Sequence, residues 1–190
     1  MVENRLILNA NFFYTKWKDQ QVTEQGDSSN IFDVYTINAG KSTIKGIEID
    51  TKYQVNNHIN LYGSVGYVQS KFNKYEDEGA NTPYDYSGND LSHTPNITAN
   101  IGASYRNTLG YFVGGNINYS GSAYEDSANT QRIDSYYTLN MKTGYEDKNF
   151  SIYIYANNLL DKKYVINNYG DDKYELGDPR VIGLNMKFYW

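Results

Sequence analysis

The sequence of 190 residues lacks the marks of several common protein classes. It has no cysteine, which excludes a disulfide framework and thiolate chemistry from this chain. No stretch approaches the roughly 18 consecutive apolar residues that a membrane-spanning helix needs. Acidic residues outnumber basic ones, 22 against 17, so the net charge of -5 leaves no basic footprint for nucleic acid.

The sequence is instead rich in tyrosine, with 21, and in glycine, with 16, although hydrophobic residues make up only 39%. Its mean hydropathy of -0.70 is low enough to suggest disorder. Disordered chains are poor in aromatic residues, however, and 16% of this chain is aromatic. The composition therefore favours an ordered structure that needs few apolar residues.

Apolar and polar residues alternate through most of the chain, as they do in strands whose two faces meet different surroundings. The run NITANIGASYR shows this clearly, with Ile97, Ile101 and Tyr105 on one face and Asn100 and Arg106 on the other. The alternation predicts eight strands, at residues 5–18, 34–55, 59–72, 96–106, 110–121, 135–146, 149–160 and 180–190.

The second of these strands is the longest, and it contains the sequence NAGKS, where a turn could break it in two. Ile37, Ile47, Ile49 and Tyr53 all fall on odd positions, so an unbroken strand keeps one apolar face throughout. A turn would preserve this parity only by chance. We therefore predict one strand over residues 34–55.

The connections between the predicted strands alternate in length. NNH, NTLG and EDKN are tight turns, whereas residues 19–33, 73–95, 122–134 and 161–179 are long and polar. Short turns at one end and long loops at the other are typical of an up-and-down antiparallel sheet with two unlike ends.

Alternation alone does not decide what the apolar face meets, because a soluble β-sandwich alternates too. The apolar runs are bracketed by aromatic residues, and Tyr111 and Tyr119 are separated by eight steps of about 3.3 Å. This length of about 26 Å projects to roughly 20 Å at a tilt of about 40°, close to the apolar band of an outer-membrane barrel. We therefore assign a membrane girdle to Tyr53, Tyr67, Tyr105, Tyr111, Tyr119, Tyr137, Tyr145 and Phe150.

The opposite face carries Arg106, Lys142, Glu146 and Lys187 beside glycine, serine and asparagine, which suits a water-filled lumen. The sequence thus predicts an all-β fold: an antiparallel, up-and-down transmembrane β-barrel segment of about eight strands, in contact with outer-membrane lipid. The alternative is a soluble β-sandwich binding module, which would be recovered in the aqueous phase without detergent.

Four segments resemble, in order, the C-terminal part of TonB-dependent outer-membrane receptors: YTINAGKSTIKGIEIDTKY, LSHTPNITANIGASY, YIYANNLLDKKYV and GDPRVIGLNMKFYW. The resemblance implies a 22-stranded barrel in the Gram-negative outer membrane, around an N-terminal plug. Residues 1–190 would form one domain that supplies about its last eight strands. We expect the plug, the TonB box and a signal peptide to be missing at the N-terminal side, so that TonB would act only through the missing plug.

The function implied by the resemblance is uptake of a scarce ligand. A ferric siderophore is the leading expectation because the GDPR ending is most similar to that branch, with cobalamin, haem and glycans left open. Five tyrosines in the long loops are candidates for stacking on the ligand, with packing between loops as the alternative: Tyr75, Tyr84, Tyr86, Tyr124 and Tyr169.

The final strand resembles the signal by which the barrel assembly machinery recognises its clients, carried here by Met186, Phe188 and Trp190. In the segment NNLLDKKY, Asn158 and Asp161 are expected to satisfy backbone groups at a bend.

No catalytic pair, cofactor site or metal site is indicated. His58 and His93 fall in a turn and a loop, with no partner at ligand spacing. We therefore predict a receptor and not an enzyme. The remaining alternative is a small autonomous outer-membrane barrel, either porin-like or an enzyme with a Ser/His or Asp/His pair on adjacent strand ends.

Overall fold

The computed structural model describes residues 5–25, 34–77, 84–170 and 172–190. One antiparallel sheet of eight strands dominates it, each strand pairing with the next long strand along the chain. The strands are β1 (Leu6–Gln25), β2 (Val34–Gln54), β3 (Ile59–Lys74), β6 (Ile97–Arg106), β7 (Tyr111–Ser120), β10 (Tyr136–Glu146), β11 (Phe150–Asn157) and β14 (Val181–Phe188). All eight predicted strands are therefore confirmed, in up-and-down order.

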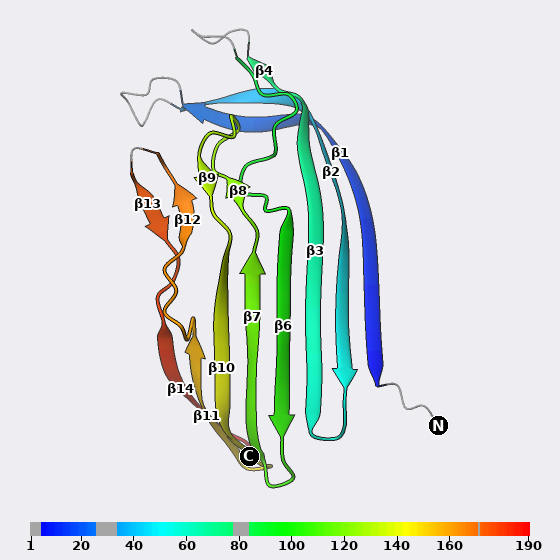
Figure 1. Cartoon of the computed structure of the whole chain (residues 1–190), viewed down its shortest axis with the longest axis vertical. Helices are drawn as coiled ribbons and strands as arrows, with labels where there is room; N and C mark the ends of the chain where they lie inside the picture. Colours follow the sequence, from blue (N-terminus) through cyan, green and yellow to red (C-terminus); the bar gives the residue numbers. More distant parts are fainter. Residues whose placement is uncertain (1–4, 26–33, 78–83, 171) are drawn as a thin grey trace.

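Short turns join the strands at one end and long connections join them at the other, as Figure 1 shows. The long connections contain three small hairpins that the alternation did not predict. They pair β4 (Glu76–Asp77) with β5 (Tyr84–Asp85), β8 (Ala123–Tyr124) with β9 (Arg132–Ile133), and β12 (Val165–Asn168) with β13 (Tyr174–Leu176). Strands of two to four residues are too short for alternation to reveal them.

The register of the ladders decides which residues share a face. Tyr53 lies opposite Leu61, Ile101 opposite Ile117, and Tyr119 opposite Tyr137. Because residues directly opposite each other in a ladder point to the same side, the apolar sets of neighbouring strands join into one continuous face. This confirms the predicted division into an apolar face and a polar face.

The first strand is longer than predicted, since it continues to Gln25 and not to residue 18. β2 is one continuous strand, as the parity predicted, but its ladder with β1 shifts near Gly40. Gly40 has a φ of 90° and Asp19 a φ of 56°, so both strands carry an irregular residue there. Bulges bend strands, and the far ends of β1 and β2 bend over the loop end of the sheet in Figure 1.

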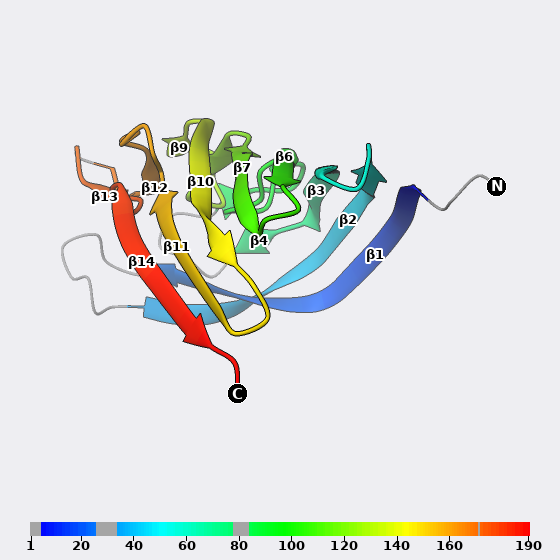
Figure 2. The same cartoon turned by 90° about the horizontal axis from the view of Figure 1, so that it is seen from below.

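Seen along the strands, the sheet is curved into an open trough, as Figure 2 shows. Within the described residues β1 pairs only with β2 and β14 only with β11, so the two edges do not meet. The hollows of the sheet lie on its polar face, where their linings include Asn116, Lys142 and Glu48. The described part of the chain contains no helix capable of spanning a membrane.

Candidate functional site: the loop end and the polar wall

An aromatic cluster covers the loop end of β3. Phe72 and Tyr75 are in edge contact, with ring centroids 4.7 Å apart, and Tyr84 stacks on Tyr86 at 4.5 Å. Tyr75 also meets both of these rings edge-on and is completely buried. The candidate Tyr75 therefore packs between loop segments, because no face of its ring is open to a ligand. Tyr84 and Tyr86 are partly exposed beside it.

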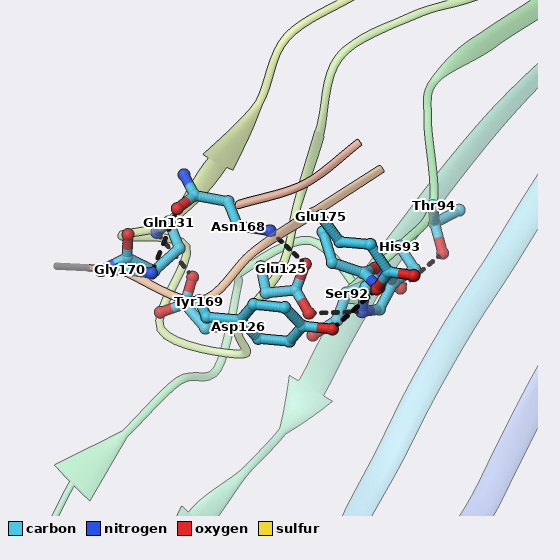
Figure 3. A network of polar contacts seen from close by, with 11 residues as sticks. Ser92, His93, Thr94, Glu125, Asp126, Gln131, Asn168, Tyr169, Gly170 and Glu175 are labelled. Carbon is cyan, nitrogen blue, oxygen red and sulfur yellow. Dashed lines mark hydrogen bonds and ion pairs between the residues drawn. The ribbon is translucent and has the colours of Figure 1, made fainter. Parts of the chain in front are cut away.

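A polar network joins three of the long connections, as Figure 3 shows, and Glu125 is its centre. One carboxylate oxygen of Glu125 lies 3.2 Å from His93 Nε2, and the other accepts a hydrogen bond from the backbone N–H of Asn168 at 2.9 Å. The Asn168 side chain donates to the carbonyl of Arg132. Residues from the β5–β6, β7–β10 and β11–β14 connections are thus held together by one half-buried carboxylate.

This pairing was missed in the sequence, where His93 shows no partner at ligand spacing. His93 and Glu125 are 32 positions apart, and only the β6–β7 hairpin brings their loops together. His58 also has a partner, since its Nδ1 lies 2.8 Å from the carbonyl oxygen of Arg106. Among the described residues no group of three or more His, Cys, Asp or Glu side chains is placed to hold a metal ion.

A second set of contacts fixes the same loops from the side of β3. The Asn129 amide bonds both backbone groups of Asp90, accepting from its N–H at 2.8 Å and donating to its carbonyl at 3.0 Å. Lys71 Nζ lies 2.8 Å from the Asp90 carboxylate. The Asp126 carboxylate caps the turn that follows it by accepting hydrogen bonds from the backbone N–H groups of Thr130 and Gln131. The loops are therefore tied together by directional bonds in addition to aromatic packing.

The β12–β13 hairpin presents the candidate Tyr169 near its tip. Tyr169 is exposed and donates its hydroxyl to Glu175 at 2.9 Å, while the Asn167 amide donates to the same carboxylate at 2.6 Å. The hydrogen bonds from Asn167 and Tyr169 lower the pKa of Glu175 below its ordinary value. The bond to Glu175 in turn raises the pKa of Tyr169.

The candidate Tyr124 lies on β8, where it is partly exposed, and its carbonyl accepts the His93 N–H at 2.7 Å. The five candidate tyrosines are thus divided between the aromatic cluster and the polar network. Tyr84, Tyr86, Tyr124 and Tyr169 keep some exposed surface, and a role in ligand binding remains a prediction for them.

The bend after β11 is built as the sequence predicted. The buried Asn158 side chain accepts the N–H of Lys162 and donates to the carbonyls of Lys162 and Asp178. Asp161 accepts the backbone N–H of Arg180 at 2.9 Å. These two side chains satisfy the backbone of the bend and connect its ends to the start of β14.

The eight girdle residues all lie on the apolar face, in two rows. Near the turn end Tyr111 contacts Tyr145, which contacts Phe150, with ring centroids 5.1 and 5.5 Å apart. Tyr53 and Tyr105 belong to the same row, while Tyr67, Tyr119 and Tyr137 form the row near the loops. On β14, Met186 and Phe188 lie opposite Ile152 and Phe150 on that face, and Trp190 follows the strand, fully exposed. Their role as an assembly signal stays a prediction.

The polar face is a wall on which aromatic rings lie opposite glycines. Tyr62 is paired in register with Gly102, Tyr153 with Gly144, and Tyr155 with Gly183. A Cβ on Gly102 would meet the Tyr62 ring at 2.4 Å, and one on Gly183 would meet the Tyr155 ring at the same distance. The glycines therefore let these rings lie against the wall, where a larger residue would force them away from it.

The family model described as TonB dependent receptor-like, beta-barrel, matches residues 2–159. The chain belongs to this family. The probable TonB-dependent siderophore receptor PiuA of Acinetobacter baumannii is 26% identical over 194 residues, covering 98% of this chain and 25% of that protein. The ferrioxamine receptor of Yersinia enterocolitica is 29% identical over 162 residues, covering 81% of this chain and 22% of that protein.

Solved structures give the same fold. The crystal structure of PiuA superposes with a TM-score of 0.76 at 25% identity, covering 98% of this chain and 26% of that one. The copper transporter OprC superposes with a TM-score of 0.78 over 98% of this chain and 29% of that one, at 15% identity, which shows the fold alone. The chain spans about a quarter of the length of the curated relatives it matches. The family is one of receptors and transporters in the outer membrane of Gram-negative bacteria, which confirms the predicted location.

Proposed function

We propose that the chain forms eight neighbouring strands in the barrel of an outer-membrane receptor that takes up a ferric siderophore, driven through TonB. The observation that carries this proposal is the sheet itself, with an apolar face for lipid, a polar wall for a lumen, and loops tied together at one end. The names of the relatives support the ligand, since PiuA is a probable siderophore receptor and another relative is the ferrioxamine receptor.

The loop end is suited to capture because its framework is fixed before a ligand arrives. The Glu125 contacts and the Asp90–Asn129 pair hold the described parts of three loops, which reduces the conformational entropy that these parts lose on binding. Exposed groups on this framework, such as the Tyr169 ring, supply contact surface. In this proposal the protein is a receptor without catalytic function.

Uptake of radioactive iron in cells that lack the gene tests the proposal. Under iron limitation, deletion should abolish uptake of at least one ferric siderophore, and the intact gene on a plasmid should restore it. Removal of TonB should give the same loss. Unchanged uptake of every ferric siderophore, together with lost uptake of another solute such as cobalamin, would overturn the choice of ligand.

A further inference from the structure

The apolar, outward face of β1 and β2 becomes basic at the loop end. Phe12 lies opposite Ile47 on the last fully apolar rung of this face, and the next rung on the same face pairs Tyr14 with Lys45. Successive residues on one face of a strand are about 7 Å apart. Lys45 therefore lies at the edge of the apolar face, at the level where the hydrocarbon of a bilayer gives way to its headgroups.

Three more lysines continue this face beyond Lys45. Lys16 follows Tyr14 on β1, with its Nζ 5.7 Å from the centre of the Tyr14 ring, and Lys18 lies directly opposite Lys41. All these lysines are exposed. We call the four of them the lysine patch: Lys16, Lys18, Lys41 and Lys45.

The positive charge of the lysine patch is not balanced by the described residues. Lys71 of the neighbouring β3 is paired with Asp90 at 2.8 Å, whereas no lysine of the patch makes an ion pair with a described residue. Asp19, next to Lys18 in the chain, makes none within the described residues either. Like charges directly opposite each other in a ladder repel, so an anion beside Lys18 and Lys41 relieves this repulsion.

The position of the lysine patch on the outward face is specific. Towards the turn end the outward positions of β1 and β2 carry no charge. On β7 and β10 the opposed Tyr119 and Tyr137 are followed, two residues nearer the loops, by Gly121 and Ser135. The outward lysines thus gather at one end of two adjacent strands, directly beyond the surface that meets lipid.

We propose that the lysine patch binds the phosphate groups of a phosphorylated lipid in the leaflet at the loop end, while the acyl chains of that lipid contact the apolar face. Ammonium groups form charge-assisted hydrogen bonds with phosphate oxygens, and lysine stems extend along apolar surface to reach the headgroups. The plug of the proposed barrel lies on the opposite side of the sheet and does not cover the patch. The proposal rests on the barrel of the proposed function and adds a lipid partner to it.

Native mass spectrometry of the intact receptor in a neutral detergent tests the proposal. The probes are diphosphoryl lipid A, monophosphoryl lipid A, phosphatidylcholine and inorganic phosphate. The test variant carries Lys16→Gln, Lys41→Gln and Lys45→Gln, and a second variant carries arginine at the same three positions. The matched control removes three exposed lysines from the polar face by Lys52→Gln, Lys142→Gln and Lys187→Gln.

The parent receptor should bind the diphosphoryl lipid several-fold more tightly than the monophosphoryl lipid, and phosphatidylcholine most weakly. The glutamine variant should lose about tenfold or more in affinity for the diphosphoryl lipid, whereas the arginine variant and the control should keep it. Lys41→Gln alone should weaken binding about fivefold, so the test does not depend on assembly of the triple variant. Equal affinities in parent and glutamine variants, or an equal loss in the control, would overturn the proposal.

The same measurements recognise other occupants of the lysine patch. Inorganic phosphate that binds as tightly as the diphosphoryl lipid, or a glutamine variant that changes the oligomeric state of the receptor instead of its lipid binding, would also overturn the proposal. Iron uptake is measured in cells that carry the same variants. Normal siderophore uptake without lysine-dependent lipid binding rejects the lipid site alone. Lysine-dependent lipid binding in a receptor that takes up no siderophore rejects the proposed function alone.

Discussion

On the apolar face of the sheet, tyrosine rings stand outward in two rows at the ends of the strands, whereas on the polar face they lie over glycines of neighbouring strands. Tyr111 and Tyr62 illustrate the contrast: the first is exposed beside Tyr145, and the second lies across Gly102. Tyrosine thus occurs in two different surroundings in this sheet. What differs is a residue opposite on a neighbouring strand, which is Tyr145 for Tyr111 and Gly102 for Tyr62.

The largest expected effect comes from placing a charge on the wrong face. Ile101→Arg puts a guanidinium in the middle of the apolar face, where lipid contact should cost about 2–4 kcal/mol. Ser64→Arg is the matched control, because Ser64 lies opposite Asn100 on the neighbouring strand but points to the polar face. The thermal unfolding of the intact receptor in detergent, and its amount in the outer membrane, measure the effect. Equal losses for both variants would contradict the assignment of the two faces.

The next effect tests the glycines beneath the rings. A Cβ on Gly144 would lie 2.2 Å from the Ile152 carbonyl oxygen and 2.5 Å from Tyr153 Cβ, so Gly144→Ala forces backbone to move. We expect a loss of about 1–3 kcal/mol in the free energy of unfolding. Gly66→Ala is the control, since its closest neighbour is the Thr98 hydroxyl at 3.1 Å. If both variants unfold at the same temperature, the close approach at Gly144 does not constrain the wall.

A smaller effect is expected where only a ring has to move. The closest atoms to a Cβ on Gly183 all belong to the Tyr155 side chain, which can swing toward the lumen. Gly183→Ala should therefore cost less than about 1 kcal/mol, the lower end for overpacking. Adding Tyr155→Ala should make Gly183→Ala neutral, as a double-mutant cycle on the unfolding midpoint would show. A cost that persists in the Tyr155→Ala background would mean that the ring is not the obstacle.

The smallest effect concerns the turn that keeps the two faces in register. Asp147 accepts the backbone N–H groups of Asn149 and Phe150 at 2.7 and 3.0 Å, and these bonds lower its pKa below the ordinary value of 3.8. A lowered pKa stabilises the folded state at every pH above the ordinary value. That contribution is lost as the pH falls through the lowered pKa.

The unfolding midpoint of the intact receptor should thus fall less steeply below about pH 4 in Asp147→Asn than in the wild type. The amide side chain of the variant also accepts hydrogen bonds but does not titrate. The difference between the two unfolding midpoints at neutral pH therefore serves as the control for the substitution itself. An identical pH profile for both proteins would show that the turn does not depend on the carboxylate. A shift of one residue in the register would turn every side chain of β11 to the opposite face of the sheet. This exposed turn is therefore important for keeping the two faces of the sheet distinct.

The outcomes at the loop end show where sequence reasoning fails. Alternation over ten or more residues located β6 and β7 within a residue or so, yet the two-residue strands β4 and β8 were missed. Tyr75 was placed in a loop and is buried, because its neighbours Phe72 and Tyr86 fold back onto it. The His93–Glu125 contact was missed since it depends on where separate loops end, and no periodicity carries that information.

The sequence by itself determined the two faces of the sheet and the number of its long strands. A strand has a period of two, so each residue's face follows from its position as soon as one side must meet lipid and the other water. The sequence also determined the bend at Asn158, where a local side chain bonds nearby backbone groups. Such features need only neighbours along the chain.

The tertiary structure alone decided which side chains meet across strands and loops. That Tyr62 lies over Gly102, that Lys18 lies opposite Lys41, and that Glu125 joins three loops depend on ladder register and on sheet curvature. These are relations between residues distant in the chain. They arise only when the backbone hydrogen bonds of all eight strands have been formed, because those bonds fix which distant residues become neighbours.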